Sequence, residues 1–201
     1  SDPWGRNRYG TPPQGRADYA FWQHILASLE PNTGRCAILF PHGVLFRDEE
    51  REMRKKIISD DVVEAVIGLG PNLFYNSPME ACIVICRSRK PTDRAGKVLL
   101  IDAVSEVTRE RAQSFLTPKH IDRIAGAYRA FADDPGFAAV ATLDEIAKRD
   151  GSISIPLYVR RGNGYEEHDL KESVAVWRTS ADGLRSAATD LFALLDGRGA
   201  T

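Results

Sequence analysis

The sequence predicts an α/β fold, in which the second half of a doubly wound sheet is followed by a helical tail. Segments with helical spacing alternate with short apolar runs, which is typical of helices packed on a sheet. Two β-rich segments, 62–69 and 80–87, are joined by a connection too short for a helical crossover, so we expect an antiparallel β-hairpin with a long loop. A heptad pattern over residues 170–195 predicts the tail.

The chain should begin with an ordered loop and a helix. Residues 1–16 are rich in Gly, Pro and Arg and cannot sustain a helix or a central strand. Residues 17–30 form a broad apolar stripe at helical spacing, which predicts an amphipathic helix. The stripe consists of Phe21, Ile25 and Leu29, flanked by Trp22 and Leu26.

A buried strand and a second helix should follow. Residues 35–40 form a continuous apolar run bounded by Gly34 and Pro41, as expected for a strand covered on both faces. Residues 47–59 are acidic at the start and basic at the end, which suits the helix dipole.

The later elements are indicated mainly by capping residues. Residues 97–104 read as another strand. Thr117 and Pro118 predict a helix start, because the hydroxyl caps free N–H groups and proline is favoured in the first turn. Thr142 and Glu145 match a capping box that opens a shorter helix.

The tail should form a helix or, if Gly183 interrupts it, a helical hairpin. Its stripe packs either on a partner or on its own domain, and the sequence leaves both open. We expect a domain boundary between 1–162 and 163–201. The stripe consists of Leu170, Val174, Trp177, Ala181, Leu184, Ala188, Leu191 and Leu195.

Composition excludes several classes of protein. The 27 Lys and Arg residues are balanced by 28 Asp and Glu, so contacts to nucleic acid must come from local basic patches. No apolar run approaches the ~20 residues of a membrane helix, and the N-terminus does not resemble a signal peptide. We therefore expect a cytoplasmic protein without a membrane segment.

The cysteines and histidines do not indicate a metal site. The odd cysteine count argues against a disulfide framework, and we interpret Cys36, Cys82 and Cys86 as apolar residues of a sheet core. The four histidines are too scattered to form a zinc set, so we predict no metal.

Loops after the strands are the natural site candidates, because open α/β sheets bind ligands beyond the carboxyl ends of their strands. Pro41, His42 and Gly43 follow the first strand, and His42 could act as a general base. However, neither a Gly-x-Ser-x-Gly elbow nor a Gly-x-Gly-x-x-Gly or phosphate-binding glycine motif accompanies them, so hydrolysis and a self-contained nucleotide site are disfavoured.

The loop over residues 70–79 carries two adjacent aromatics. Phe74 or Tyr75 could stack on an extruded base while an amide, Asn72 or Asn76, reads the base edge. The alternative is that one aromatic fills the core and the other covers the strand connection.

A basic cluster follows the second strand of the predicted hairpin. Arg87, Arg89 and Lys90 could contact DNA phosphates, or they could belong to a solvated edge strand.

Four segments together resemble the modification subunit of type I restriction-modification systems, an N6-adenine DNA methyltransferase. Their order and intervals are those of the family, and they cover roughly residues 1 to 160. They are Tyr9-Gly-Thr-Pro-Pro13 with Ala17-Asp-Tyr-Ala-Phe-Trp-Gln-His24, Phe40-Pro-His-Gly-Val-Leu-Phe46, Glu64-Ala-Val-Ile-Gly-Leu-Gly-Pro-Asn-Leu-Phe-Tyr75, and Ile153-Ser-Ile-Pro-Leu-Tyr158.

The resemblance implies the C-terminal half of a Rossmann-like, S-adenosylmethionine-dependent methyltransferase sheet. It also implies DNA, a specificity subunit and a restriction subunit as partners, with residues 163–201 as the docking tail. Phe74, Tyr75 and Asn76 would grip the target base, Pro41, His42 and Gly43 would line its pocket, and Arg87, Arg89 and Lys90 would hold phosphates.

In the family, the glycine turn that holds the cofactor and the catalytic Asn-Pro-Pro-Phe precede this region. We therefore expect a fragment that lacks both and is inactive alone. A minority interpretation takes Ser1, Asp2, Pro3 and Trp4 as a degenerate catalytic loop. The alternative function is a non-catalytic scaffold or docking module of a DNA-modifying complex.

Overall fold

The computed structural model divides the chain into two compact units, 1–161 and 162–201, and each is described by itself. The first unit holds the sheet and four helices, and the second holds one long helix. The structure describes residues 2, 4–75, 77–111, 113–160 and 170–196.

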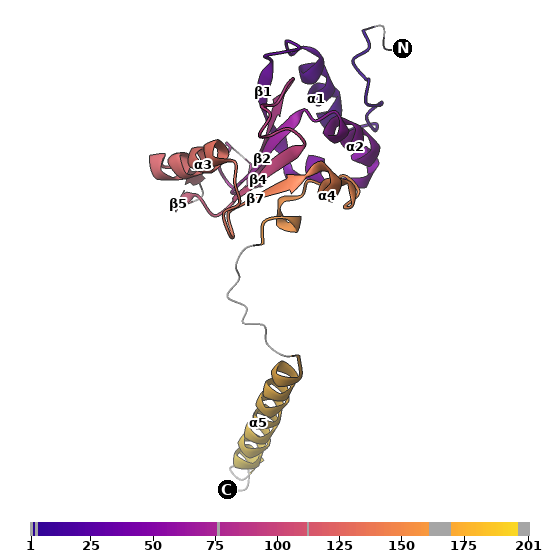
Figure 1. The fold of residues 1–201 in the computed structure, drawn as a ribbon. Helices are drawn as coiled ribbons and strands as arrows, with labels where there is room; N and C mark the ends of the chain where they lie inside the picture. Colours follow the sequence, from indigo (N-terminus) through magenta and orange to yellow (C-terminus); the bar gives the residue numbers. More distant parts are fainter. Residues whose placement is uncertain (1, 3, 76, 112, 161–169, 197–201) are drawn as a thin grey trace. The chain divides into compact units, whose positions relative to one another are not determined.

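A five-stranded mixed sheet forms the centre of the first unit (Figure 1). Its order is β1-β3-β2-β4-β7, with β2 parallel to β4 and all other neighbours antiparallel. Consequently β1, β2 and β4 run in the same direction, and their carboxyl ends share one edge, here called the carboxyl edge. The strands are β1 Arg35–Pro41, β2 Val63–Leu69, β3 Ala81–Arg87, β4 Lys97–Ala103 and β7 Ala138–Thr142.

The predicted α/β class is confirmed, and so is the antiparallel pairing of the segments now seen as β2 and β3. Leu69 lies opposite Ala81 and Gly68 opposite Cys82, with an irregularity between Val63 and Ala65. The pairing brings both ends of the 70–80 connection to the carboxyl edge.

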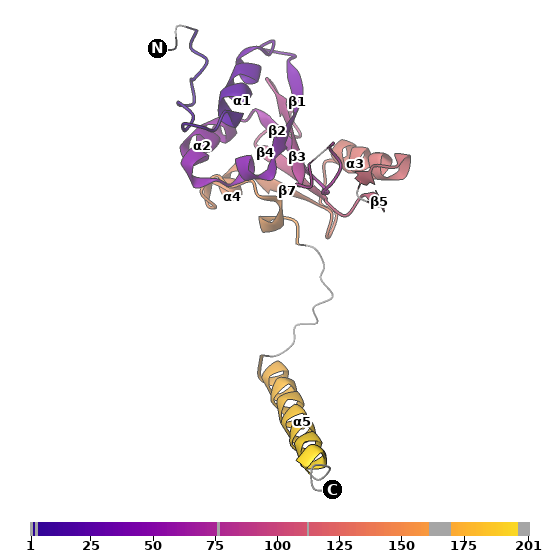
Figure 2. The same cartoon turned by 180° about the vertical axis from the view of Figure 1, so that it is seen from behind.

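Helices cover the two faces of the sheet unequally (Figures 1 and 2). One face packs against α1, α2 and α4, and the other against α3. Short 3-10 turns and a small ribbon, β5 with β6, complete the unit. The bounds are α1 Asp18–Ala27, η1 His42–Leu45, η2 Asp48–Glu50, α2 Arg51–Ser59, β5 Thr108–Glu110, β6 Gln113–Phe115, α3 Pro118–Ala130, α4 Leu143–Ala147 and η3 Ile155–Leu157.

Both predicted helix caps are present. The Thr142 side chain accepts a hydrogen bond from the Glu145 N–H (3.2 Å), and the Glu145 carboxylate accepts one from the Thr142 N–H (2.8 Å). At α3, Thr117 forms the same reciprocal arrangement with His120 in place of an acidic residue. Capping chemistry therefore fixes the start of each helix.

The predicted apolar stripe of α1 is correct only in part, because its flanking residues Trp22 and Leu26 pack on the core whereas Phe21 does not. Phe21 is 63% exposed, whereas Tyr19, Trp22 and Gln23 are buried. The Trp22 ring packs between Tyr19 and Phe40 at centroid distances of 5.2 and 5.4 Å, so aromatic packing on β1 sets the rotation of the helix.

The expectation that residues 35–40 are covered on both faces is also wrong. β1 is an edge strand, and its residues alternate between exposed and covered positions. Cys36, Ile38 and Phe40 face the core, while Ala37 and Leu39 lie on the open side.

The second unit contains α5, Leu170–Asp196. The helix continues through Gly183, which excludes the hairpin alternative for this segment. Among the described helices, none is both long enough and apolar enough to cross a membrane.

Candidate functional site at the carboxyl edge

Four chain segments meet at the carboxyl edge of the sheet. η1 follows β1, the 70–80 connection follows β2, and the segment that leads to the β5–β6 ribbon follows β4. η3 packs against the end of β4. The loop positions selected from the sequence therefore do lie together, as the parallel direction of β1, β2 and β4 requires.

Two glycines allow these segments to approach closely. A Cβ on Gly68 would lie 2.8 Å from Ile155 Cδ1, and a Cβ on Gly70 would lie 2.5 Å from the Val104 carbonyl oxygen. Larger residues would push η3 and the 104–107 segment away from β2.

His42 joins the end of β1 to the start of β3. Its Nε2 lies 2.8 Å from the Ala81 carbonyl oxygen, to which it donates, and its Nδ1 lies 3.8 Å from the Glu80 carboxylate. With both ring nitrogens facing acceptors, this geometry favours holding the loop over abstracting a proton from a ligand.

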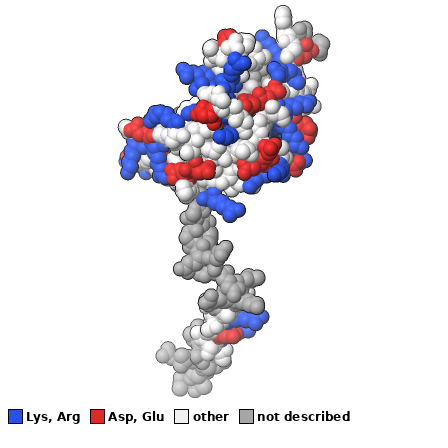
Figure 3. Space-filling model, viewed as in Figure 1, with Lys and Arg blue, Asp and Glu red and all other residues white. Residues whose placement is uncertain are grey.

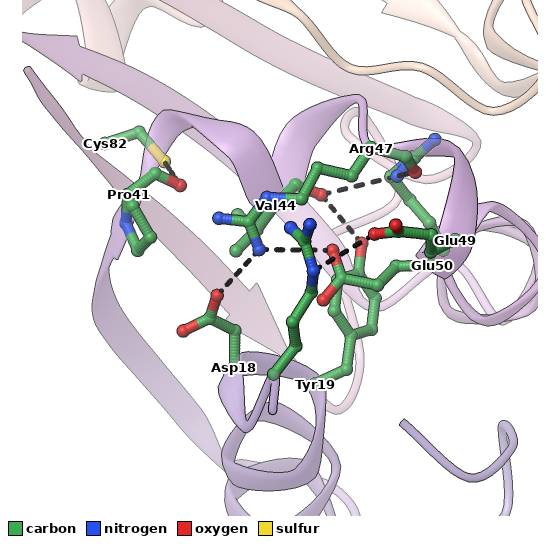
Figure 4. A network of polar contacts seen from close by, with 10 residues as sticks. Asp18, Tyr19, Pro41, Val44, Arg47, Glu49, Glu50 and Cys82 are labelled. Atoms are coloured by element: carbon green, nitrogen blue, oxygen red, sulfur yellow. Dashed lines mark hydrogen bonds and ion pairs between the residues drawn. The ribbon is translucent and has the colours of Figure 1, made fainter. Parts of the chain in front are cut away.

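η1 is held by a network of polar contacts (Figure 4). The Tyr19 hydroxyl donates to the Val44 carbonyl oxygen at 2.8 Å. The Arg47 guanidinium pairs with Asp18 at 3.0 Å and with Glu50 at 3.5 Å. It also fills the space beside Gly43, so this residue accommodates Arg47 instead of leaving an open pocket wall.

Burial raises the pKa of two groups in this network, so both are weaker acids than usual. Desolvation raises the pKa of Glu50, whose side chain is fully buried, and nearby Arg47 opposes the shift. Burial likewise raises the pKa of the Tyr19 hydroxyl. Tyr19 therefore stays protonated and keeps donating to η1 at neutral pH.

In the 70–79 loop the core is filled by Leu73, which packs against the cluster under α3. Phe74 is 36% exposed and Tyr75 is 84% exposed. The alternative in which an aromatic of this loop fills the core is therefore wrong. The Ser77 N–H donates to the Phe74 carbonyl oxygen at 3.1 Å, and Asn76 lies outside the described residues.

Large apolar side chains are exposed on every segment of this edge. Such a gathering is typical of a binding surface, because isolated soluble domains rarely leave apolar groups clustered. The side chains are Phe46, Phe74, Tyr75, Met79, Phe115 and Leu157.

The β5–β6 ribbon is a part of this edge that the sequence did not predict. The Ser114 N–H donates to the Asn72 carbonyl oxygen at 2.9 Å, which ties the ribbon to the aromatic loop. Arg109 and Arg111 are exposed and have no carboxylate partner among the residues that the structure describes. A cavity of about 740 Å³ adjoins the ribbon, lined by Glu110, Arg111, Gln113 and Phe115.

The predicted phosphate contacts need correction. Lys90 Nζ is bonded to Asp61 at 2.5 Å and to the Lys97 carbonyl oxygen at 2.7 Å, and its side chain is 1% exposed. Arg87 pairs with the buried Glu64 at 2.9 Å. Both cations stabilise the fold, and only Arg89 is exposed.

This basic segment also lies at the wrong end of the sheet. It follows the carboxyl end of β3, which is antiparallel to its neighbours, so the strand length separates it from the aromatic loop. Seven residues of strand span about 20 Å. The structure therefore does not bring Arg87, Arg89 and Lys90 together with Phe74.

The chain that directly follows the N-terminal tetrapeptide lies at the opposite end of the sheet from the carboxyl edge. Gly5, directly after Trp4, lines a cavity of about 610 Å³ together with Val62 and Ser88, beside the start of β2 and the end of β3. Asp2 accepts a hydrogen bond from the Asn7 N–H at 2.6 Å, and this contact lowers the pKa of its carboxyl. Ser1 and Pro3 lie outside the described residues.

The turn at the end of β2 does not leave room for S-adenosylmethionine. Nucleotide-containing cofactors of open α/β sheets bind at glycine turns that leave space beyond a strand end. The turn at Gly68 and Gly70 is instead filled by Ile155, Val104 and Val107. No step through the cofactor is therefore assigned to these residues.

Charges of both signs are mixed on one face of the first unit (Figure 3). Figure 3 shows Lys and Arg interspersed with Asp and Glu on the visible face, without a large patch of one sign. Attraction of a polyanion would therefore depend on local cations.

Comparison with known proteins finds methylase subunits of type I restriction enzymes among the relatives of this chain. The N-6 DNA Methylase family model matches residues 1–167. The type I restriction enzyme MjaVIII methylase subunit of Methanocaldococcus jannaschii is 36% identical over 168 residues, which are 82% of this chain and 28% of that protein. The HindI methylase subunit of Haemophilus influenzae is 35% identical over 170 residues, which are 80% of this chain and 37% of that protein.

A solved structure agrees with these relatives. The type I restriction-modification system methyltransferase subunit from Streptococcus thermophilus matches with a TM-score of 0.73 and 34% identity, over 79% of this chain and 34% of that chain. The chain thus spans about one third of the length of the proteins it matches.

Proposed function

The chain belongs to the N-6 DNA methylase family, and we propose that it forms the target-base side of a type I modification methylase. The complete protein would transfer a methyl group from S-adenosylmethionine to N6 of adenine in DNA. In this proposal the cofactor and the catalytic tetrapeptide are held by residues outside this chain, and the chain alone is inactive.

The observation that carries the proposal is the exposure of Phe74 and Tyr75 in the loop between β2 and β3. Methylation of a base requires its extrusion from the duplex, and aromatic faces compensate for the lost stacking. Leu73 anchors the loop in the core, so the neighbouring rings can meet a base without unfolding.

Phosphates next to an extruded base would meet the ribbon. Arg109 and Arg111 lie on the segment that is hydrogen bonded to the aromatic loop, whereas Arg89 lies at the opposite end of β3. We therefore assign the phosphate contacts of this site to Arg109 and Arg111 and not to the earlier cluster.

Phe74→Ala in the complete methylase is expected to slow methylation of DNA roughly 5- to 150-fold, the equivalent of the ~1–3 kcal/mol of one base–aromatic stack. Single-turnover rates with a radiolabelled methyl donor measure the effect. Phe21→Ala, which removes an exposed ring from α1, is the matched control and should leave the rate unchanged.

An unchanged rate in Phe74→Ala would transfer the role to Tyr75. Unchanged rates in both single variants and in the double variant would contradict the proposal and favour a docking module without a part in catalysis. A large fall in melting temperature for Phe74→Ala would indicate a packing role instead.

We further propose that α5 docks on the specificity subunit of a type I complex. Trp177 and Leu184 are 69% and 75% exposed on the predicted stripe, and Val174 is also exposed. An apolar stripe of this length on a single helix favours association with another helix. We also propose a restriction subunit as a partner of the same assembly. This proposal rests on the family alone and not on any residue of this chain.

A further inference from the structure

Two of the three cysteines lie directly opposite each other on neighbouring strands. Cys36 of β1 pairs with Cys86 of β3, and both side chains face the same core cluster. Directly opposed residues of antiparallel strands have Cα atoms about 4.5 or about 5.5 Å apart. Disulfides accept Cα separations of about 4.4–6.8 Å. The Cα spacing of this pair, about 5.5 Å because Gly34 and Ser88 two residues away are hydrogen bonded, therefore lies within the range of a disulfide.

The two thiols differ in exposure. Cys36 is half-buried on an edge strand, whereas Cys86 is completely buried. Cys36 therefore keeps some contact with solvent, from which a small oxidant can approach it, whereas Cys86 has none. In this arrangement Cys36 would be the thiol that attacks the oxidant, and Cys86 would be the resolving thiol that then closes the disulfide.

The interaction between the two thiols favours the same assignment. Cys36 lies opposite Cys86 in the strand pairing, and its side-chain interaction with Cys86 lowers the pKa of Cys36. The same contact and burial raise the pKa of Cys86. Because the thiolate is the nucleophile, Cys36 is the more reactive of the pair.

We propose that Cys36 and Cys86 form a thiol-oxidation site whose substrate is hydrogen peroxide. The Cys36 sulfur attacks the peroxide oxygen, the O–O bond breaks, and the released hydroxide takes a proton and leaves as water. The Cys86 sulfur then attacks the resulting sulfenic acid, an S–S bond forms, and the sulfenic oxygen leaves as a second water. Two thiols lose two electrons and two protons, and the peroxide is reduced.

Cys82 provides an internal control. It lies on the same strand and face as Cys86 but opposite Phe40, and its thiol points to the Pro41 carbonyl oxygen at 4.0 Å. Burial raises the pKa of Cys82 to about 12. Four residues of strand place it about 13 Å from Cys86, so it should stay reduced.

The test exposes the chain to hydrogen peroxide, then denatures it, alkylates free thiols and maps the peptides. We expect loss of two of the three alkylatable cysteines, a peptide joining Cys36 to Cys86, and recovery of both thiols with dithiothreitol. Cys82→Ala should form the same disulfide. Cys86→Ser should instead leave a sulfenic acid at Cys36 that dimedone traps.

Three results would overturn the proposal. Alkylation of all three cysteines after peroxide would show that the pair does not oxidise. A peptide joining Cys82 to Cys36 or Cys86 would show that the strand register does not decide which two cysteines pair. A disulfide between the Cys36 residues of two copies would show that Cys86 does not react with the oxidised Cys36. The map of the unmodified sequence decides among these outcomes even if a variant fails to fold.

Discussion

Glu64→Ala is expected to lower the free energy of unfolding by about 3–5 kcal/mol, because it removes a fully buried carboxylate with its three hydrogen bonds and leaves two partly buried cations without their counter-ion. Glu64 is fully buried in β2, where its carboxylate pairs with Arg87 at 2.9 Å and with Arg94 at 3.1 Å. The Tyr128 hydroxyl of α3 donates to the same carboxylate at 2.7 Å. One side chain thus joins β2, β3 and α3.

Urea denaturation of the whole chain, followed by tryptophan fluorescence, measures this loss. Glu52→Ala is the control, since Glu52 forms an exposed pair with Lys55 at 3.5 Å, and it should cost less than about 1 kcal/mol. Tyr128→Phe removes one hydrogen bond to a charged group and should cost about 1.5–3 kcal/mol. Equal effects of Glu64→Ala and Glu52→Ala would contradict the stabilising role of the network.

Deletion of residues 166–201 from the complete methylase is expected to abolish its co-purification with the specificity subunit. The deletion removes all of α5 and its exposed stripe. Because α5 belongs to a separate compact unit, the sheet should keep its melting temperature. Normal stoichiometry after the deletion would contradict docking through this helix.

A point variant separates the stripe from the rest of α5. Trp177→Ala should weaken the complex by roughly 30-fold or more, as expected for a central aromatic of an interface that contributes at least ~2 kcal/mol. Thr179 lies on the opposite side of the helix by its spacing from Trp177, so Thr179→Ala should leave binding unchanged. Equal weakening by both variants would contradict the assignment of the interface to the stripe.

The sequence predicted those elements that are encoded by local chemistry. The caps at Thr117 and Thr142 are visible in a few neighbouring residues, and the short 70–80 connection required antiparallel strands. β7 was missed because its Ala-rich segment has little strand preference of its own, and pairing with β4 places it in the sheet.

The candidate site was also predicted only in part, because some of its features depend on contacts that form only after folding. Loops at strand ends follow from the alternation of elements, so the positions of His42 and Phe74 could be anticipated. The fate of Lys90 could not, because its partner Asp61 is 29 residues away and the pairing exists only after folding. The Arg-x-Arg pattern at Arg109 and Arg111 was the available signal for the ribbon, but it gained meaning only through contact with Asn72.

The most direct test of the central claim is photochemical cross-linking of the complete methylase to DNA with 5-iodouracil in place of the methylated adenine. A base extruded onto an aromatic ring should cross-link to Phe74 or Tyr75, and peptide mapping identifies which ring it meets. 5-Iodouracil at a flanking position, which stays stacked in the duplex, should not cross-link to the 70–79 loop. Cross-links that form efficiently but map only outside this chain would contradict the assignment of the target-base side to it, and cross-links elsewhere in the chain would contradict the role of Phe74 and Tyr75.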